Sequence, residues 1–254
     1  MKKETLFVAF STQKGGVGKT TFTVLVASYL YYLKGYNVVV VDCDYPQHSI
    51  SAMRKRDGEQ VNGDANYKLL AFNQFKALGK KAYPVLCSTP EDAITTAEEF
   101  LKTEPMKMDV VFFDLPGTVN SEGIISSLAS MDYIFTPITA DRVVLESSLS
   151  FAMTVNNLLV KNEAYRIKGL HLFWNQVDGR EKTDLYGIYE KTIEELGLPL
   201  MQTYIPDTKR YKKELSGEKV SVFRSTLFPA DKRMIKGSNL EELVAEIGYI
   251  IKLY

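Results

Sequence analysis

A glycine-rich segment near the N-terminus constrains the fold of this chain more than any other feature. The segment reads Gln13-Lys14-Gly15-Gly16-Val17-Gly18-Lys19-Thr20-Thr21 and lies between an apolar run, Leu6 to Phe10, and an amphipathic stretch, Thr20 to Leu33. Strand, loop and helix in this order are the context of a phosphate-binding loop, whose backbone N–H groups surround phosphate oxygens at a helix N-terminus. The sequence therefore predicts a nucleotide-binding α/β domain.

Each residue type in this loop has a chemical reason to be there. Glycines permit backbone conformations that turn successive N–H groups inward. In such loops the lysine at Lys19 reaches the β and γ phosphates, and the hydroxyl at Thr20 ligates Mg²⁺. The strict pattern has glycine where this chain has Gln13, and a glycine-rich surface turn is the alternative interpretation. We expect Mg²⁺ and ATP, with nucleotide contacts from Lys14, Gly15, Gly16, Val17, Gly18, Lys19, Thr20 and Thr21.

Apolar runs of strand length alternate with amphipathic stretches along the chain. Nearly continuous hydrophobicity in a run is typical of parallel strands covered on both faces. The predicted strands are Leu6 to Phe10, Val38 to Val41, Val110 to Phe113, Tyr133 to Pro137, Leu170 to Trp174 and Met201 to Ile205. The predicted helices are Thr20 to Leu33, Ser121 to Ala129, Leu145 to Leu159, Tyr186 to Leu196 and Leu240 to Ile251. This alternation predicts a doubly wound, mainly parallel sheet with helices on both faces.

Length and charge narrow the possibilities further. A chain of 254 residues with 45% hydrophobic content predicts one domain spanning residues 1–254, with 54–80 as a surface excursion that can hold a helix. The 31 basic and 31 acidic residues balance, so any charged partner must meet a local patch. Two cysteines and no signal-like N-terminal run favour a cytoplasmic protein.

Two acidic motifs follow predicted strands, Asp42-Cys43-Asp44 and Asp114-Leu115-Pro116-Gly117. With the glycine-rich loop, they resemble the deviant Walker A box, the D-x-D box and the Walker B motif of the ParA/MinD ATPases, in the ParA-like branch. The resemblance covers most of the chain and implies a P-loop NTPase fold. It places the additional signature lysine of that family at Lys14.

The resemblance also implies roles for these residues. In that family, the residue that matches Asp44 positions or activates the attacking water. The residues that match Asp42 and Asp114 hold the Mg²⁺ shell, together with Thr20. Phosphoryl transfer requires charge neutralisation and a placed nucleophile, which fits these carboxylates. Signature lysines act across an ATP-sandwich dimer, so we expect an ATP-dependent homodimer with Lys14, Lys19 and Asp44 as catalytic residues.

Weaker matches suggest where the base lies. Asn175 follows a predicted strand at the position that meets adenine in MinD-like members, and Ile205-Pro206-Asp207 resembles the I-P-R segment that flanks the base. We therefore expect adenine contacts from Asn175, Pro206 and Asp207. Two departures are Tyr45, inserted where ParA proteins read D-P-Q, and Asp207, where many carry arginine. The first leaves the geometry of the switch loop open, and the second bears on DNA contacts.

A local positive patch suggests the partner. Residues 206 to 236 contain nine basic and four acidic side chains. ParA-type dimers bind DNA without sequence preference, and the patch predicts phosphate contacts from Lys209, Arg210, Arg224 and Arg233. Such clusters are usually solvated surface, so this assignment rests mostly on the resemblance. The last predicted helix carries Glu241, Glu242 and Glu246 opposite its apolar stripe, which disfavours a membrane anchor.

Two functions remain open at this point. One is an ATPase with slow, partner-stimulated hydrolysis that acts in DNA partitioning or the maintenance of a plasmid or conjugative element, activated by an unknown ParB-like protein. The other is an ATP-binding protein that positions a conjugation complex or another assembly without binding DNA. Cluster-holding cysteine pairs and a tyrosine-rich tail are absent from the sequence, which argues against iron–sulfur carriers and tyrosine autokinases.

Overall fold

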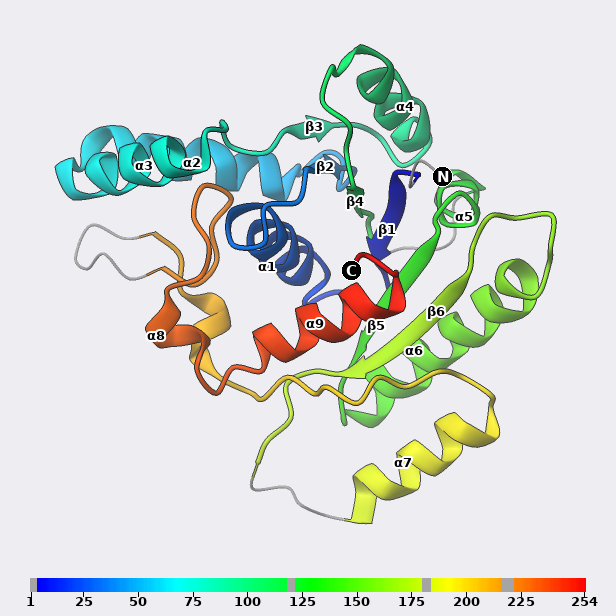
Figure 1. The fold of residues 1–254 in the computed structure, drawn as a ribbon. Helices are drawn as coiled ribbons and strands as arrows, with labels where there is room; N and C mark the ends of the chain where they lie inside the picture. The colour runs from blue at the N-terminus through cyan, green and yellow to red at the C-terminus, as the bar shows by residue number, and fades with distance from the viewer. Residues whose placement is uncertain (1–3, 118–121, 180–183, 216–221) are drawn as a thin grey trace.

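Six parallel strands form one sheet at the centre of the molecule, in the order β3-β2-β4-β1-β5-β6 (Figure 1). The computed structural model describes residues 4–117, 122–179, 184–215 and 222–254. The strands are β1 (Leu6–Phe10), β2 (Val38–Asp42), β3 (Val85–Cys87), β4 (Val110–Asp114), β5 (Tyr133–Ile138) and β6 (Gly169–Trp174). The predicted doubly wound, parallel α/β fold is confirmed.

The central strand β1 explains why the apolar runs are almost uninterrupted. It pairs with β4 through Leu6 and Val110 and with β5 through Val8 and Tyr133. Leu6, Val8 and Phe10 pack into one core, whereas Phe7 and Ala9 pack into the other, because successive side chains point to opposite faces. Both faces are covered, so neither can be polar.

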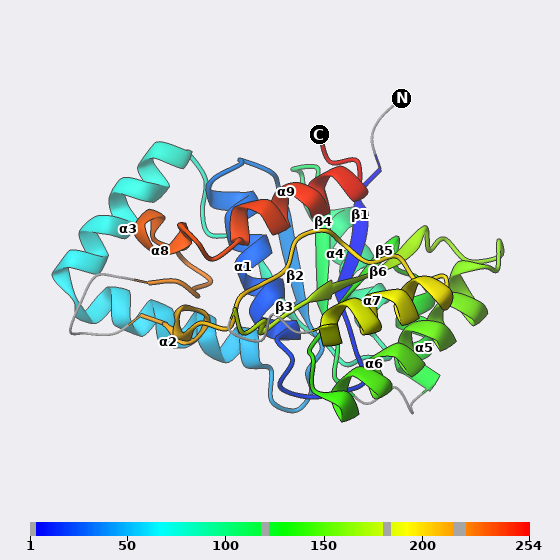
Figure 2. The ribbon, with the colours of Figure 1, turned by 90° about the horizontal axis from the view of Figure 1, so that it is seen from below.

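The two faces carry different helices (Figures 1 and 2). One core contains residues of α1 (Lys19–Tyr32) and α9 (Leu240–Ile250). The other contains residues of α4 (Ala93–Thr103), α5 (Glu122–Ala129), α6 (Arg142–Val155) and α7 (Asp184–Glu195). The apolar stripe predicted for the last helix therefore faces the core.

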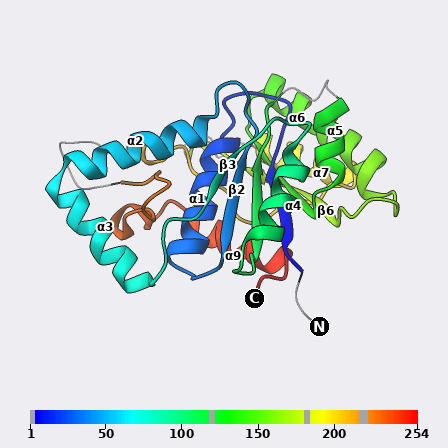
Figure 3. The same ribbon diagram turned by 90° about the horizontal axis from the view of Figure 1, so that it is seen from above.

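Helices α2 (Ser49–Gly63) and α3 (Ala65–Leu78) form an arm that extends from one side of the sheet (Figure 3). Asp64 begins α3 by accepting a hydrogen bond from the Asn66 N–H (2.8 Å). Residues 222–228, which we call the strap, pack against this arm in a small core of Tyr67, Ala71, Val222, Leu227 and Phe228. The excursion expected at residues 54–80 is thus two packed helices.

Three elements differ from the sequence-based expectation. Residues 201–205 do not form the predicted strand: they follow β6 through single bridges, Leu172 to Leu200 and Val177 to Pro206. The N–H groups of Met201 and Ile205 bond the carbonyls of Leu172 and Trp174 in β6 (2.8 Å each), but the Thr203 N–H between them donates to Glu246, so the ladder is not continuous. Strand β3 is not among the predicted strands, because three residues are too few to show an alternating pattern. Helix α4 is not among the predicted helices.

Helix α6 continues into a π-helical turn, η1 (Asn156–Val160). Within the described residues, Arg142–Val160 is long and apolar enough to cross a membrane, with 19 residues and a mean hydropathy of 1.4. Its side chains Leu145, Leu149 and Phe151 are buried in the sheet core. In this fold, that apolar character serves to cover the sheet.

A buried carboxylate at the amino ends of the strands provides a test of the fold. Asp132 is 1% exposed and accepts hydrogen bonds from the Phe7 N–H (2.8 Å), Arg166 (2.7 Å) and Lys168 (2.9 Å). Replacing it removes three charge-assisted bonds, two of them to half-exposed cations that water screens. We expect Asp132→Ala to lower the free energy of unfolding by about 2 kcal/mol in urea denaturation. The control, Glu163→Ala on the exposed surface, is expected to change it by less than about 0.5 kcal/mol.

Candidate nucleotide site

The carboxyl edge of the sheet contains a cavity of about 610 Å³, in the range of small-molecule sites. The glycine-rich loop joins β1 to α1 there, and the loops after β2, β4 and β6, residues 206–212 and Arg224 supply its other walls. Ligands of open parallel sheets bind at this edge, where strand ends and helix N-termini meet. The lining residues are Gly15, Gly16, Gly18, Lys19, Thr20, Thr21, Phe22, Asp44, Gln47, Leu115, Pro116, Gly117, Asn175, Gln176, Pro206, Asp207, Thr208, Tyr211, Lys212 and Arg224.

Gly16 and Gly18 of the loop both have a positive φ, and Gly18 is the one whose added methyl group would also meet neighbouring atoms. Its φ is +99°, in the left-handed region, and it caps the N-terminus of α1. A Cβ atom at this position would lie 2.9 Å from Phe22 and 3.2 Å from the Asn175 amide. The residue therefore sets both the turn into the helix and the closeness of the loop to its neighbours.

Lys19 lies within the cavity rather than on the surface. Its ammonium donates to the Lys14 carbonyl (3.1 Å), and a Cβ on Gly117 would lie 2.9 Å from the ammonium nitrogen. Burial lowers the pKa of Lys19, while the nearby carboxylates of Asp114 and Asp44 oppose that change. Because burial has already removed much of the water around this ammonium, its binding to anionic phosphates has a smaller desolvation cost.

Three carboxylates stand at this edge with different surroundings. Asp42 is fully buried, and its Oδ2 accepts from the Ser51 N–H (2.8 Å). Asp44 lines the cavity and accepts from the Ser49 hydroxyl (3.3 Å). Asp114 is 1% exposed, and burial raises its pKa to about 7, against the opposing effects of Thr20 and Lys19. Burial likewise raises the pKa of Asp42.

The surroundings of two of these carboxylates fit a divalent cation. Among the described residues, Asp42 Oδ1 and both oxygens of Asp114 are buried without a hydrogen-bond partner. Unpaired buried carboxylate oxygens are costly, and they are the donors that Mg²⁺ prefers. No cluster of three or more Asp, Glu, His or Cys able to hold a metal occurs in the described part of the chain. The remaining ligands would then come from Thr20, water and nucleotide phosphates.

The two lysines of the loop occupy different places. Lys14 is partly exposed and is not among the residues that line the cavity of its own chain. Val17 also lies outside the lining: it is buried, and its carbonyl accepts from the Asn175 side chain (2.9 Å). The other predicted loop contacts, from Gly15 to Thr21, all face the cavity.

The residues predicted to meet adenine all line the cavity. Asn175, Pro206 and Asp207 line it, beside the rings of Phe22 and Tyr211. The Asn175 oxygen also accepts from the Gln176 N–H (2.9 Å), so this side chain braces the loop in addition to facing the cavity. Tyr211 is not predicted from the sequence: it lines the cavity, and its ring centre lies 6.0 Å from that of Phe22, which is distant along the chain.

The predicted DNA contacts separate into two groups. Lys209 and Arg233 are exposed, with Arg233 paired to Asp231 (3.0 Å). Arg210 donates to the carbonyls of Met234 (3.1 Å) and Lys236 (2.5 Å), and Arg224 lines the nucleotide cavity instead of the outer surface. Lys219 of the same basic patch lies outside the described residues.

Comparisons with known proteins agree with this geometry. Residues 8–221 match the family model of the CobQ/CobB/MinD/ParA nucleotide binding domain. The chain is 28% identical to the chromosome-partitioning ATPase Soj of Thermus thermophilus, over 68% of this chain and 70% of that protein. Two solved structures share the fold, each with a TM-score of 0.58. One is a plasmid partition protein from Borrelia burgdorferi (16% identity, 96% of this chain and 100% of that one). The other is the septum site-determining protein MinD from Pyrococcus horikoshii complexed with Mg-ADP (17% identity, 98% and 97%).

The geometry of Gly18 gives a direct test of the loop. We expect Gly18→Ala to raise the Kd for Mg²⁺-ATP at least tenfold, roughly 1.4 kcal/mol, because the added methyl group displaces Phe22 and Asn175. Isothermal titration calorimetry measures the change. Gly35→Ala is the matched control: Gly35 has φ +78°, but a methyl group added there would meet no atom within 4 Å, so it shares the backbone strain without touching the loop. Equal affinities for both variants would contradict the assigned role.

Proposed function

Because the chain belongs to the CobQ/CobB/MinD/ParA nucleotide-binding family, we propose that it is a Mg²⁺-ATP-dependent switch that dimerises with ATP and hydrolyses it slowly. The observation that carries this proposal is the pair of lysines on one loop, with Lys19 lining the cavity and Lys14 outside it. A lysine outside its own cavity is available to a nucleotide held by a second copy. The switch acts in the cytoplasm, where nucleoid DNA is within reach.

Hydrolysis would use the residues at the carboxyl edge in distinct ways. Mg²⁺, held by Thr20 and through water by Asp42 and Asp114, would neutralise phosphate charge when bound. Lys19 binds the terminal phosphates, and the N–H groups of the loop orient them. Of the three carboxylates at the strand ends, Asp44 lines the cavity, and we assign it to hold the water for attack. Asp42, fixed by the Ser51 N–H, supports the loop that carries Asp44.

Asn175, Pro206 and Asp207 are proposed to flank adenine, with Phe22 and Tyr211 forming the apolar wall beside it. An amide group matches the adenine edge, and aromatic rings supply contact area for the base. The side chain of Asn175 keeps one N–H and one lone pair beyond those used by Val17 and Gln176. That remaining capacity is what a base would meet.

Nonspecific DNA binding is supported by exposed cations near the cavity. They lie on η2 (Lys209–Lys212), on α8 (Lys232–Ile235) and just beyond them, and comprise Lys209, Lys212, Lys213, Lys232, Arg233 and Lys236. Soj of Thermus thermophilus is named for chromosome partitioning, and the Borrelia burgdorferi structure for plasmid partition. By analogy, this chain would partition a chromosome, plasmid or conjugative element, with a ParB-like protein stimulating hydrolysis.

The alternative is a protein that positions other machinery in response to ATP and does not bind DNA. The same exposed lysines would then meet an acidic protein surface, for example in a conjugation complex. The two functions share the nucleotide site and dimer, so only the target of the basic surface separates them.

The hydrolysis proposal predicts different defects for two residues of the cavity. We expect Asp44→Ala to bind Mg²⁺-ATP within about threefold of the wild type and to dimerise, while turnover falls about hundredfold. Lys19→Ala is expected to lose high-affinity binding because the buried charge for the phosphates is gone. Turnover is measured by phosphate release and dimerisation by analytical ultracentrifugation. Undiminished turnover of Asp44→Ala would remove this carboxylate from the mechanism.

The DNA proposal predicts a salt-dependent, ATP-dependent interaction. We expect DNA retention by the wild type with ATP but not with ADP, and a steep fall in retention as salt rises. The double variant Lys209→Glu/Lys213→Glu is expected to weaken retention at least about tenfold, whereas Lys191→Glu, on the exposed side of α7, leaves it unchanged. ATP-dependent dimers that ignore DNA at every salt concentration would favour the positioning alternative.

A further inference from the structure

Arg224 is a cation in the nucleotide cavity that reaches the site from the strap. Its side chain is 22% exposed and lines the cavity, and its Nη1 donates to the Thr21 hydroxyl (2.7 Å). Thr21 lies in the first turn of α1, where free N–H groups favour phosphate oxygens. The guanidinium thus stands beside the anion-binding end of the helix.

The place of Arg224 along the cavity indicates which phosphate it meets. In the proposed nucleotide site, Lys19 binds the terminal phosphates, and Asn175 and Pro206 flank the base; all three line the cavity. Arg224 also lines the cavity, and it donates to Thr21, two residues past Lys19 in the first turn of α1. A phosphate located between the terminal phosphates and the base is the α-phosphate.

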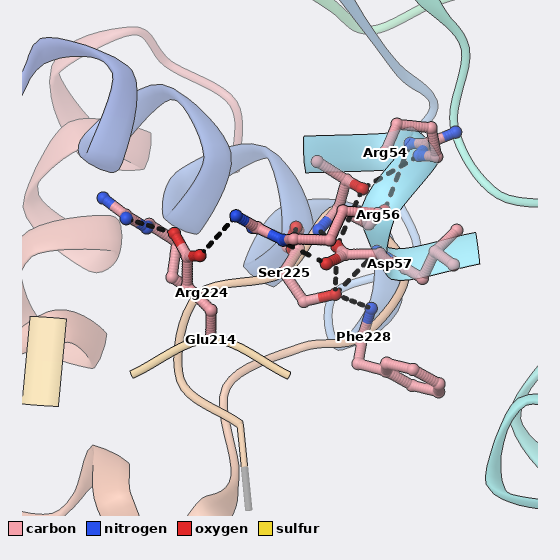
Figure 4. Close-up of polar contacts among 10 residues, drawn as sticks. Arg54, Arg56, Asp57, Glu214, Arg224, Ser225 and Phe228 are labelled. Atoms are coloured by element: carbon pink, nitrogen blue, oxygen red, sulfur yellow. Dashed lines mark hydrogen bonds and ion pairs between the residues drawn. The ribbon is translucent and has the colours of Figure 1, made fainter. Parts of the chain in front are cut away.

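The charge around Arg224 leaves it able to take an anion. One carboxylate, Glu214, is shared by two guanidinium groups: it pairs with Arg224 on one side and with Arg56 (2.6 Å) on the other (Figure 4). Glu214 is therefore divided between two guanidinium groups and neutralises Arg224 only in part; Arg56 also lies 3.9 Å from Asp57. Within the described part of the chain, Arg224 Nε is buried without a hydrogen-bond partner. Because Nε is buried, a phosphate would be met by the terminal nitrogens, each of which has two N–H donors and uses one, Nη1 for Thr21 and Nη2 for Glu214.

The backbone next to Arg224 is held from the other side by a buried carboxylate. Asp57 of α2 is fully buried and accepts from the Ser225 hydroxyl (2.8 Å), the Thr226 N–H (2.9 Å) and the Thr226 hydroxyl (3.1 Å) (Figure 4). Arg54 also donates to the Thr226 carbonyl (3.1 Å). Arg224 therefore extends from a fixed segment, which reduces the entropy lost when it binds a ligand.

We propose that Arg224 binds the α-phosphate of the nucleotide within its own chain, and that Glu214 positions the guanidinium for that contact. The proposal deepens the proposed nucleotide-binding function and rests on it. It also reassigns Arg224, which the basic patch of the sequence placed among DNA contacts, to the nucleotide.

The test measures Kd for Mg²⁺-ATP and Mg²⁺-ADP by calorimetry on the full chain. Both nucleotides carry an α-phosphate, so Arg224→Ala is expected to raise both Kd values by a similar factor, about tenfold. Arg224→Lys, which keeps the charge without the planar fork, is expected to recover part of the loss. Arg56→Ala is the matched control: it removes the other partner of Glu214, does not line the cavity, and is expected to stay within about twofold.

A second set of variants, measured in the same way, tests the positioning role of Glu214. Glu214→Ala is expected to raise both Kd values severalfold, and Glu214→Gln, which still offers an oxygen to Arg224, is expected to restore most of the affinity. Thermal unfolding without nucleotide shows that each variant is folded, so a loss of affinity in a folded variant reports on the ligand contact.

The outcomes separate this proposal from the proposed function. Unchanged Kd values for Arg224→Ala, or a loss confined to ATP, would overturn the α-phosphate assignment while leaving the ATP switch intact. Reduced DNA retention with unchanged Kd values would also overturn it and return Arg224 to the DNA surface. A wild-type chain that binds neither nucleotide would overturn both proposals.

Discussion

The nucleotide edge depends on a partly buried cation beside three carboxylates, two of them buried. Lys19 is partly desolvated at the start of α1, and Asp44 and Asp114 lie close enough to favour its charge. These groups meet only because β1, β2 and β4 run parallel and end at the same edge of the sheet. Unpaired oxygens on Asp42 and Asp114 cost stability in the absence of a ligand, and the apolar layers on both faces of the sheet make that cost tolerable.

How far the sequence predicts this structure depends on how local the signal is. The loop from Lys14 to Thr21 and the buried strands can be recognised, because their residues carry a period or a motif. The segment 201–205 has apolar residues like those of a strand. It lies beside β6 at the edge of the sheet, but its pairing with β6 is interrupted, so no strand forms. The pattern does not resolve helices α2 and α3, because glycines at 58 and 63 interrupt it and Asp64 begins a second helix at that point.

The parts of the site that the sequence does not predict come from contacts distant along the chain. Arg224 and Thr21 are 203 residues apart, and Ser225 and Asp57 are 168 apart. Neither pair has a local pattern, and by charge alone Arg224 resembles the exposed lysines near it. The basic patch counted from the sequence is therefore two features in space: a surface of exposed lysines, and an arginine that lines the cavity.

The central position of β1 has a consequence for synthesis of the chain. The strand before the glycine-rich loop gains its neighbours only when β4 and β5 have been made, about a hundred or more positions later. Contacts of such long range make folding slow, because distant segments must meet before they are stabilised. The strap, whose Arg224 contacts Thr21, is synthesised later still. A nascent chain therefore carries the phosphate loop for most of its elongation without the walls needed to retain a nucleotide.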